Sequence, residues 1–161
     1  MAKTFEISTM NIKRVIAVKL EVGEDLITVI ERVAKENNIK TGFFFAVGAT
    51  TKARYGIYNA AKRAYEPHER EGFFEITSVL GNIAAIVDKE GRDTGEVFVH
   101  AHIAMADHEG RVFGGHLLPG GTAIFGLGEA VIFEVDKTIT RLKEEIEDRG
   151  YSPWRLPKET S

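Results

Sequence analysis

The stretch that decides the fold is VFVHAHIAMADHEGRVFGGHLL, residues 97–118. It alternates apolar and polar positions, turns at DHEG (residues 107–110) and then alternates again, which is the pattern of a β-hairpin. An aspartate at the start of the turn and a glycine three residues later predict a type I turn closed by a glycine with positive φ. Such a loop pairs Asp107 with Arg111, and it therefore places His102 directly opposite His116.

This register gathers histidines on one face of the hairpin. His100 lies two residues before His102 on the same strand, so the two side chains share a face at a Cα separation of roughly 7 Å. The opposite face is apolar, and we expect it to pack on a core. Its members are Val97, Val99, Ala101, Ile103, Met105, Phe113 and Leu117.

The histidine cluster predicts a metal site, with zinc as the expected ion. His100, His102 and His116 would supply three neutral imidazoles and leave a fourth position open, as in catalytic zinc sites. Water in that position would lose a proton near neutral pH and act as a nucleophile. The alternative is that the three histidines make hydrogen bonds at a subunit interface or in a polar pocket. His68 and His108 are expected to be exposed and uninvolved.

Glu75 is the candidate catalytic residue. It lies in a predicted strand between Phe74 and Ile76, where a charge needs a partner. It would accept a hydrogen bond from a histidine, serve as a fourth ligand or act as a general base. Equally, it would pair with an arginine of a neighbouring subunit. Gly114 and Gly115 beside the histidines would leave room for a ligand or allow close packing of the strands.

Composition limits the class of protein. The 161 residues suit a single domain over residues 1–161, and 43% hydrophobic residues are typical of a globular protein. The absence of cysteine excludes disulfides and thiolate ligands. No apolar run is long enough for a membrane span and no signal peptide opens the chain, so we expect a cytoplasmic protein without a membrane partner.

Charge argues against nucleic-acid binding by the domain itself. The formal net charge is −3, and no basic stripe is visible, although DNA-binding domains usually carry one. Five cations would have to gather on the folded surface to form such a patch. They are Arg14, Lys52, Arg54, Lys62 and Arg63.

The remaining pattern predicts an α+β fold dominated by an antiparallel sheet. A helix is expected from Gly23-Glu24-Asp25 to Asn37-Asn38, and residues 61–70 read as a surface loop. After Thr138 the pattern suits either a helix or a segment that begins as a strand. Strands are expected at residues 12–20, 42–49, 53–60, 72–81, 82–90 and 122–135, with a tight corner at Gly81-Asn82.

The order of these motifs resembles the PPC domain family, named for plants and prokaryotes, over about residues 10–145. The resemblance rests on GEDLITVIERVAKENNIKTGFFFAVGA, GFFEITSVLGNIA and HAHIAMADHEGRVFGGHL. The last block, His-x-His followed by a turn and Gly-Gly-His-Leu, looks like the prokaryotic stand-alone form. The middle block is similar to the Gly-x-Phe-Glu-Ile-x-Ser-Leu stretch of plant members, with Val79 here preceding Leu80.

The resemblance implies a compact antiparallel sheet flanked by helices and assembled as a homotrimer. In plants the domain follows AT-hook motifs in nuclear proteins, and prokaryotic relatives bear a DNA-binding label by that association. No Arg-Gly-Arg-Pro core of an AT-hook occurs in this sequence. We therefore expect a trimeric protein whose metal site binds, or acts on, a small molecule. The alternatives are a DNA-binding or regulatory protein and a structural trimer that binds a protein partner.

Overall fold

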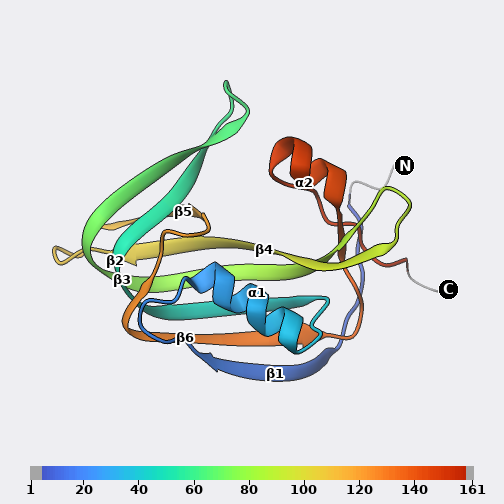
Figure 1. Cartoon of the computed structure of the whole chain (residues 1–161), viewed down its shortest axis with the longest axis horizontal. Coiled ribbons are helices and arrows are strands. Elements are labelled where there is room, and N and C mark those ends of the chain that lie inside the picture. The colour runs from blue at the N-terminus through green and yellow to red at the C-terminus, as the bar shows by residue number, and fades with distance from the viewer. Residues whose placement is uncertain (1–4, 159–161) are drawn as a thin grey trace.

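A mostly antiparallel sheet with two helices makes up the computed structural model, which describes residues 5–158 (Figure 1). The expected α+β architecture is therefore confirmed. In chain order the elements are β1 (Ile12–Lys19), α1 (Leu26–Glu36), β2 (Gly42–Asn59), β3 (Ala64–Val87), β4 (Asp93–Ala106), β5 (Val112–Leu117), β6 (Ile124–Val135), β7 (Thr140–Leu142) and α2 (Lys143–Arg149).

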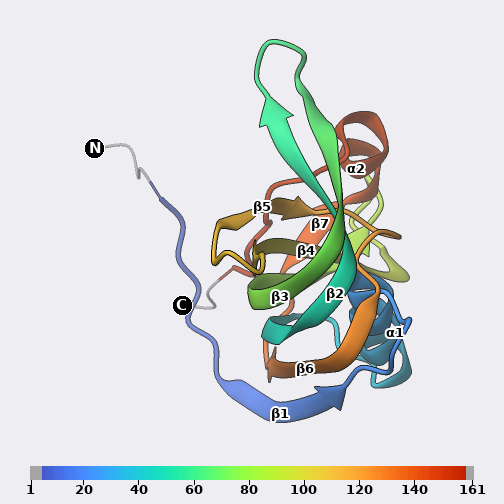
Figure 2. The same ribbon diagram turned by 90° about the vertical axis from the view of Figure 1, so that its left-hand side faces the viewer.

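The strands close on themselves into a barrel. Their order in the sheet is β1-β6-β2-β5-β4-β3-β7, and β2 also pairs with β3, so that β2, β5, β4 and β3 form a ring. Only the short β7 runs parallel to its neighbour, β3. The paired ends of β2 and β3 project beyond the rest of the molecule (Figures 1 and 2). The histidine-bearing strands β4 and β5 lie within the ring.

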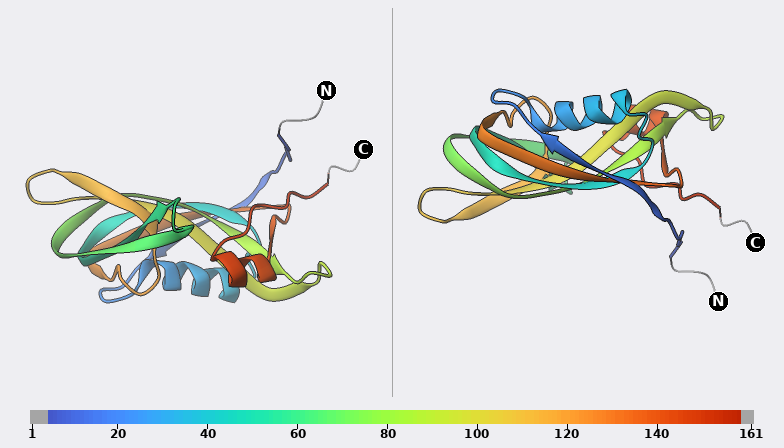
Figure 3. Two further views of the ribbon diagram at one scale, coloured as in Figure 1. Left: turned by 90° about the horizontal axis from the view of Figure 1, so that it is seen from above. Right: turned by 90° about the horizontal axis from the view of Figure 1, so that it is seen from below.

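Helix α1 covers one face of the sheet (Figure 3). Asp25 is its N-cap, and the carboxylate accepts a hydrogen bond from the Thr28 backbone N–H at 3.2 Å. The helix ends at Asn37, as the sequence predicts. Its apolar stripe packs against inward-facing residues of the strands, and Leu26 and Ile30 are completely buried there.

The hairpin of β4 and β5 has the register predicted from its turn. The Asp107 N–H donates to the Arg111 carbonyl at 3.1 Å, and Gly110 has a φ of 75°. His102 lies opposite His116, as expected. The predicted apolar face is buried in the core at Val99, Ala101, Ile103, Met105 and Leu117, with Val97 and Phe113 packed at its edge.

Strands β2 and β3 are longer than the pattern predicts. They form one hairpin that includes residues 61–70, where a surface loop was expected, and only residues 60–63 lie outside the two strands. The expected corner at Gly81-Asn82 is also wrong, because β3 continues straight through it. A Cβ on Gly81 would lie 2.3 Å from the Phe44 ring and 2.8 Å from the His100 carbonyl oxygen. Gly81 thus admits an aromatic ring to the core rather than making a turn.

The C-terminal segment crosses the face opposite α1. After the short β7 and α2, the Trp154 ring meets the Phe43 ring edge-on at 6.0 Å. The indole Nε1 donates to Asn82 Oδ1 at 3.2 Å. This segment therefore closes one side of the face that carries the histidines. Neither helix of residues 5–158 is long and apolar enough to cross a membrane.

Candidate metal centre and adjoining cavity

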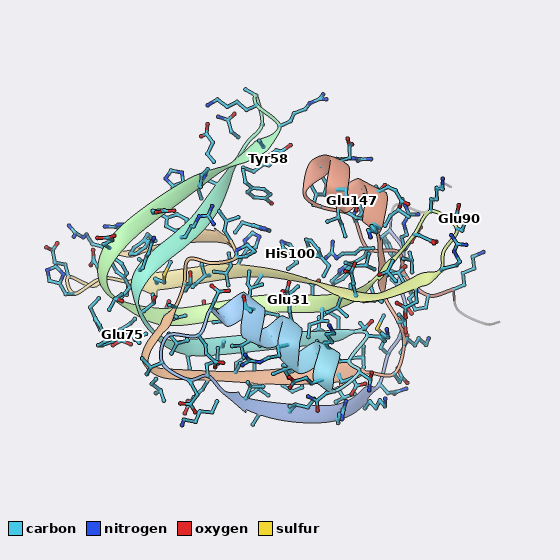
Figure 4. The ribbon with its side chains drawn as sticks, viewed as in Figure 1. Glu31, Tyr58, Glu75, Glu90, His100 and Glu147 are labelled. Atoms are coloured by element: carbon cyan, nitrogen blue, oxygen red, sulfur yellow. The ribbon has the colours of Figure 1, made fainter. Side chains whose placement is uncertain are left out.

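The structure brings His100, His102 and His116 together (Figure 4 labels His100). Their ring centroids are 5.3 Å apart for His100 and His102, 4.9 Å for His100 and His116, and 5.4 Å for His102 and His116. His100 and His102 come from β4 and His116 from β5. Since strand residues alternate between faces, all three point away from the core that α1 covers.

His116 is the most constrained of the three. It is half-buried, stacks on Tyr65 at 4.3 Å, and has an Nδ1 that is buried without a hydrogen-bond partner. Burial, followed by the neighbouring His100 and His102, lowers the pKa of His116 from 6.5 to about 4. Burial is also the main cause that lowers the pKa of His100, with smaller contributions from Arg141 and His102. Both rings are therefore neutral at pH 7 and keep a lone pair for a ligand.

The cluster fits a divalent ion that prefers imidazole. One nitrogen of each ring lies within 4.8 Å of the others. A tetrahedral zinc ion with Zn–N bonds of 2.0–2.1 Å needs nitrogens about 3.4 Å apart. Small rotations of the three side chains bring the nitrogens from within 4.8 Å to this shorter separation. His102 is exposed, so its ring has room to rotate. His116 would supply one of its two ring nitrogens to such an ion.

Glu75 does not join the histidines within one chain. It is exposed and lies opposite Ala106, four residues beyond His102 on β4, which is roughly 13 Å along the strand. Figure 4 shows it well away from His100. It lines a different hollow, together with Val47 and Leu127. A pairing with a neighbouring subunit, the other role expected for it, stays a prediction.

The remaining candidates have structural roles. A Cβ on Gly114 would lie 1.9 Å from the Ile103 carbonyl oxygen, and one on Gly115 would lie 2.7 Å from that of Gly56. Both glycines thus allow close approach of backbones and do not open space for a ligand. His68 stacks on Tyr55, and His108 is exposed in the turn. Neither belongs to the cluster.

A cavity of about 490 Å³ adjoins the histidines. Its size lies in the range of small-molecule sites. Strands β3, β4, β5 and β7 and the C-terminal segment form its walls. The lining residues are Tyr65, Asn82, Phe98, His100, His116, Arg141, Tyr151, Ser152, Pro153 and Trp154.

Arg141 is the residue of this cavity that sequence reasoning missed. It lies on β7, is only 6% exposed, and donates to the Ser152 carbonyl and, at 3.0 Å, to Asn82 Oδ1. Its guanidinium lies 5.2 Å from the centre of the Phe98 ring. No local pattern marks it, because its partners come from distant strands and from the C-terminal segment. Only its place between Ile139 and Leu142, in a segment that could begin as a strand, could have drawn attention to it.

Solved structures share this fold over nearly the whole chain. A plant- and prokaryote-conserved (PPC) protein of Pyrococcus horikoshii is 26% identical, with a TM-score of 0.79 over 96% of this chain and 100% of the other. A metal-containing protein of Archaeoglobus fulgidus is 24% identical, with a TM-score of 0.77 over 94% and 99% of the two chains. A proposed DNA-binding protein of Bacteroides thetaiotaomicron is 21% identical, with a TM-score of 0.75 over 94% and 100%.

Sequence comparison adds a similar protein and a matching family model. The chain is 33% identical over 108 residues to the bifunctional protein GlmU of Synechococcus sp. (strain JA-3-3Ab), which covers 66% of this chain but only 15% of that protein. The family model of the Plants and Prokaryotes Conserved (PCC) domain, the domain that the solved structures call PPC, matches residues 7–136. This match confirms the resemblance of the three sequence blocks. The chain belongs to the PCC domain family.

Proposed function

We propose that this protein binds one divalent metal ion per chain, zinc for preference, through His100, His102 and His116. It would bind a small molecule in the adjoining cavity. The observation that carries the proposal is the buried, unpartnered Nδ1 of His116 among three imidazoles, because a buried nitrogen without a partner is costly. The similar fold from A. fulgidus is described as metal-containing, which supports a metal in this family.

The choice of zinc rests on the ligand set. Neutral imidazole is a good ligand for zinc, and the chain has no cysteine to select a softer ion. When bound, such an ion supplies a Lewis acid at the wall of the cavity. The protein's own contribution is to hold two of the three rings neutral and partly buried, so that binding at pH 7 displaces no proton from them.

Elemental analysis of untagged protein tests the metal site. After incubation with zinc and removal of the excess, we expect about one zinc per chain in the wild type and much less in His102→Ala. His102 is exposed, so its loss removes a ligand with little effect on packing. His108→Ala, in the nearby turn, should keep its zinc. Wild-type protein without zinc, or His102→Ala with a full complement, would contradict the proposal.

DNA binding has less support from the described surface. Some similar folds are described as DNA-binding proteins, including the one from B. thetaiotaomicron. In this chain, however, four of the five cations that would have to gather into a basic patch are paired with acids. Arg14 pairs with Glu134, Lys52 and Arg54 pair with Glu69, and Lys62 pairs with Glu66. Cations that are paired with acids add little net positive charge to the surface. Few counterions would therefore be released from DNA phosphates on binding.

We also propose self-association, with the homotrimer as its expected form. Leu80 is 67% exposed, and it lies between the exposed Phe45 and His102 in paired positions of three neighbouring strands. Residues in paired positions share a face, so this apolar row runs directly up to the metal centre. Exposed apolar patches of this kind are typical of interfaces. A second copy seated on the row would contact the rim of the site at His102.

A further inference from the structure

The guanidinium of Arg141 is a buried cation without a counter-ion. Among residues 5–158 it has no carboxylate partner, and its hydrogen bonds go to the neutral oxygens of Ser152 and Asn82. Its Nε is buried and has no partner at all. An arginine side chain stays charged in proteins, and a buried charge is expensive unless an opposite charge pairs with it. The fold itself therefore supplies no anion where one is needed.

The position of Arg141 shows where such an anion would lie. Arg141 lines the same cavity as His100 and His116. The cavity wall between these groups is aromatic, with Tyr65 stacked on His116 and Phe98 beside the guanidinium. A cavity lined by a cation, a set of metal ligands and flat aromatic rings beside them suits a planar organic anion.

We infer that the cavity binds small carboxylic acids with a flat or aromatic body, whose carboxylate lies between Arg141 and the metal held by the three histidines. This inference rests on the proposed metal site and specifies its ligand. The carboxylate supplies the missing counter-charge of Arg141, and the body of the acid lies against the aromatic wall. A neutral amide of the same shape leaves the cation unpaired and binds more weakly.

Asn82→Asp is the decisive variant. Asn82 Oδ1 accepts hydrogen bonds from both Arg141 and Trp154, and aspartate has the same shape and keeps both bonds. The substitution gives Arg141 an internal counter-ion, so the cavity no longer needs an external one. It removes no volume, whereas Arg141→Gln empties part of a buried site. Asn38→Asp, at the exposed end of α1, adds the same charge away from the cavity and is the matched control.

Calorimetric titration with benzoate and with benzamide tests the inference. In zinc-loaded wild type and Asn38→Asp we expect benzoate to bind at least about tenfold more tightly than benzamide. In Asn82→Asp the affinity for benzoate should fall about tenfold or more, with little change for benzamide. Arg141→Gln should show the same loss, and Arg141→Lys, which keeps the charge, should restore part of the affinity. Equal affinity of wild type and Asn82→Asp for benzoate would overturn the inference.

Metal content and parallel titration of the zinc-free protein separate this inference from the proposed metal site. Zinc at one per chain together with no effect of Asn82→Asp would leave the metal site standing and remove the role of Arg141. If the protein takes up no zinc but Asn82→Asp still weakens benzoate binding, the role of Arg141 would stand and the proposed metal site would be removed. With both correct, zinc should tighten benzoate binding, and Asn82→Asp should weaken it with or without the ion.

Discussion

At the scale of single residues, His116 gives the protein a defined pH dependence. Its pKa is about 4 in the folded protein and about 6.5 in the unfolded chain. As the pH falls, the unfolded chain takes up the proton first, so the free energy of unfolding decreases between pH 6.5 and 4. Above pH 6.5 this contribution is constant. A pKa shift of this size lowers the free energy of unfolding by at most about 3 kcal/mol. Because the ring is only half-buried, we expect a smaller decrease.

Urea unfolding of zinc-free protein between pH 7 and pH 5 measures this effect. His116→Gln should lose a large part of the pH dependence in that range, and the rest comes from His100, whose pKa burial also lowers; His108→Gln, in the exposed turn, should keep the full pH dependence. An unchanged slope in His116→Gln would show that the imidazole is not held neutral by its burial. Carboxylates titrate mainly below this range, so they add little to the difference between the variants.

Single residues also show what a sequence can and cannot reveal about a site. The three histidines were predictable because all of them lie on one hairpin, whose register follows from four turn residues. Arg141 was not predictable, since it reaches the cavity through a short parallel pairing of β7 with β3. Its importance comes from the absence of a paired acid among residues 5–158, which only the folded chain displays. Glu75 was singled out as a strand charge that needs a partner, but it is exposed to solvent and lies away from the histidines within one chain.

At the scale of elements, the turn of the β4–β5 hairpin sets the geometry of the histidine cluster. Gly110 has a φ of 75°, a conformation that costs any residue with a Cβ. Gly110→Ala should lower the free energy of unfolding by about 1 kcal/mol. Gly110→Asn should cost less, since asparagine tolerates the left-handed region. Denaturant unfolding of the two variants checks this order, and an alanine variant as stable as the wild type would contradict it.

The same elements show the limits of local patterns. The turn at 107–110 was predictable because its hydrogen bonds form within five residues. The continuity of β3 was not, because Gly81 reads locally as a corner and only the ring of Phe44, from β2, explains it. The polar residues 64–70 likewise belong to β3 through pairing with the far end of β2. Where the evidence for an element lies across the sheet, the sequence alone misleads.

At the scale of the whole molecule, we expect the exposed row of Phe45 and Leu80 beside the histidines to set the state of assembly. If Leu80 is central to the interface, Leu80→Glu should convert the expected trimer to monomers, because a carboxylate would be buried without a partner. Analytical ultracentrifugation of both proteins measures the change. Val22→Glu, at an equally exposed apolar position outside this row, should remain associated. A monomeric wild type would contradict the proposed trimer, and a trimeric Leu80→Glu would place its interface elsewhere.

The C-terminal segment has a practical consequence for every binding experiment. The chain contains a single tryptophan, Trp154, and its indole forms part of the cavity wall. The indole donates a hydrogen bond to Asn82 Oδ1, which also accepts one from Arg141. With excitation above the tyrosine absorption band, the tryptophan fluorescence of the protein therefore comes from one known place. A ligand that enters the cavity, or a substitution that rearranges Asn82, changes the surroundings of this one emitter. The protein thus carries its own optical reporter, and occupancy of the cavity can be followed in dilute solution without a label.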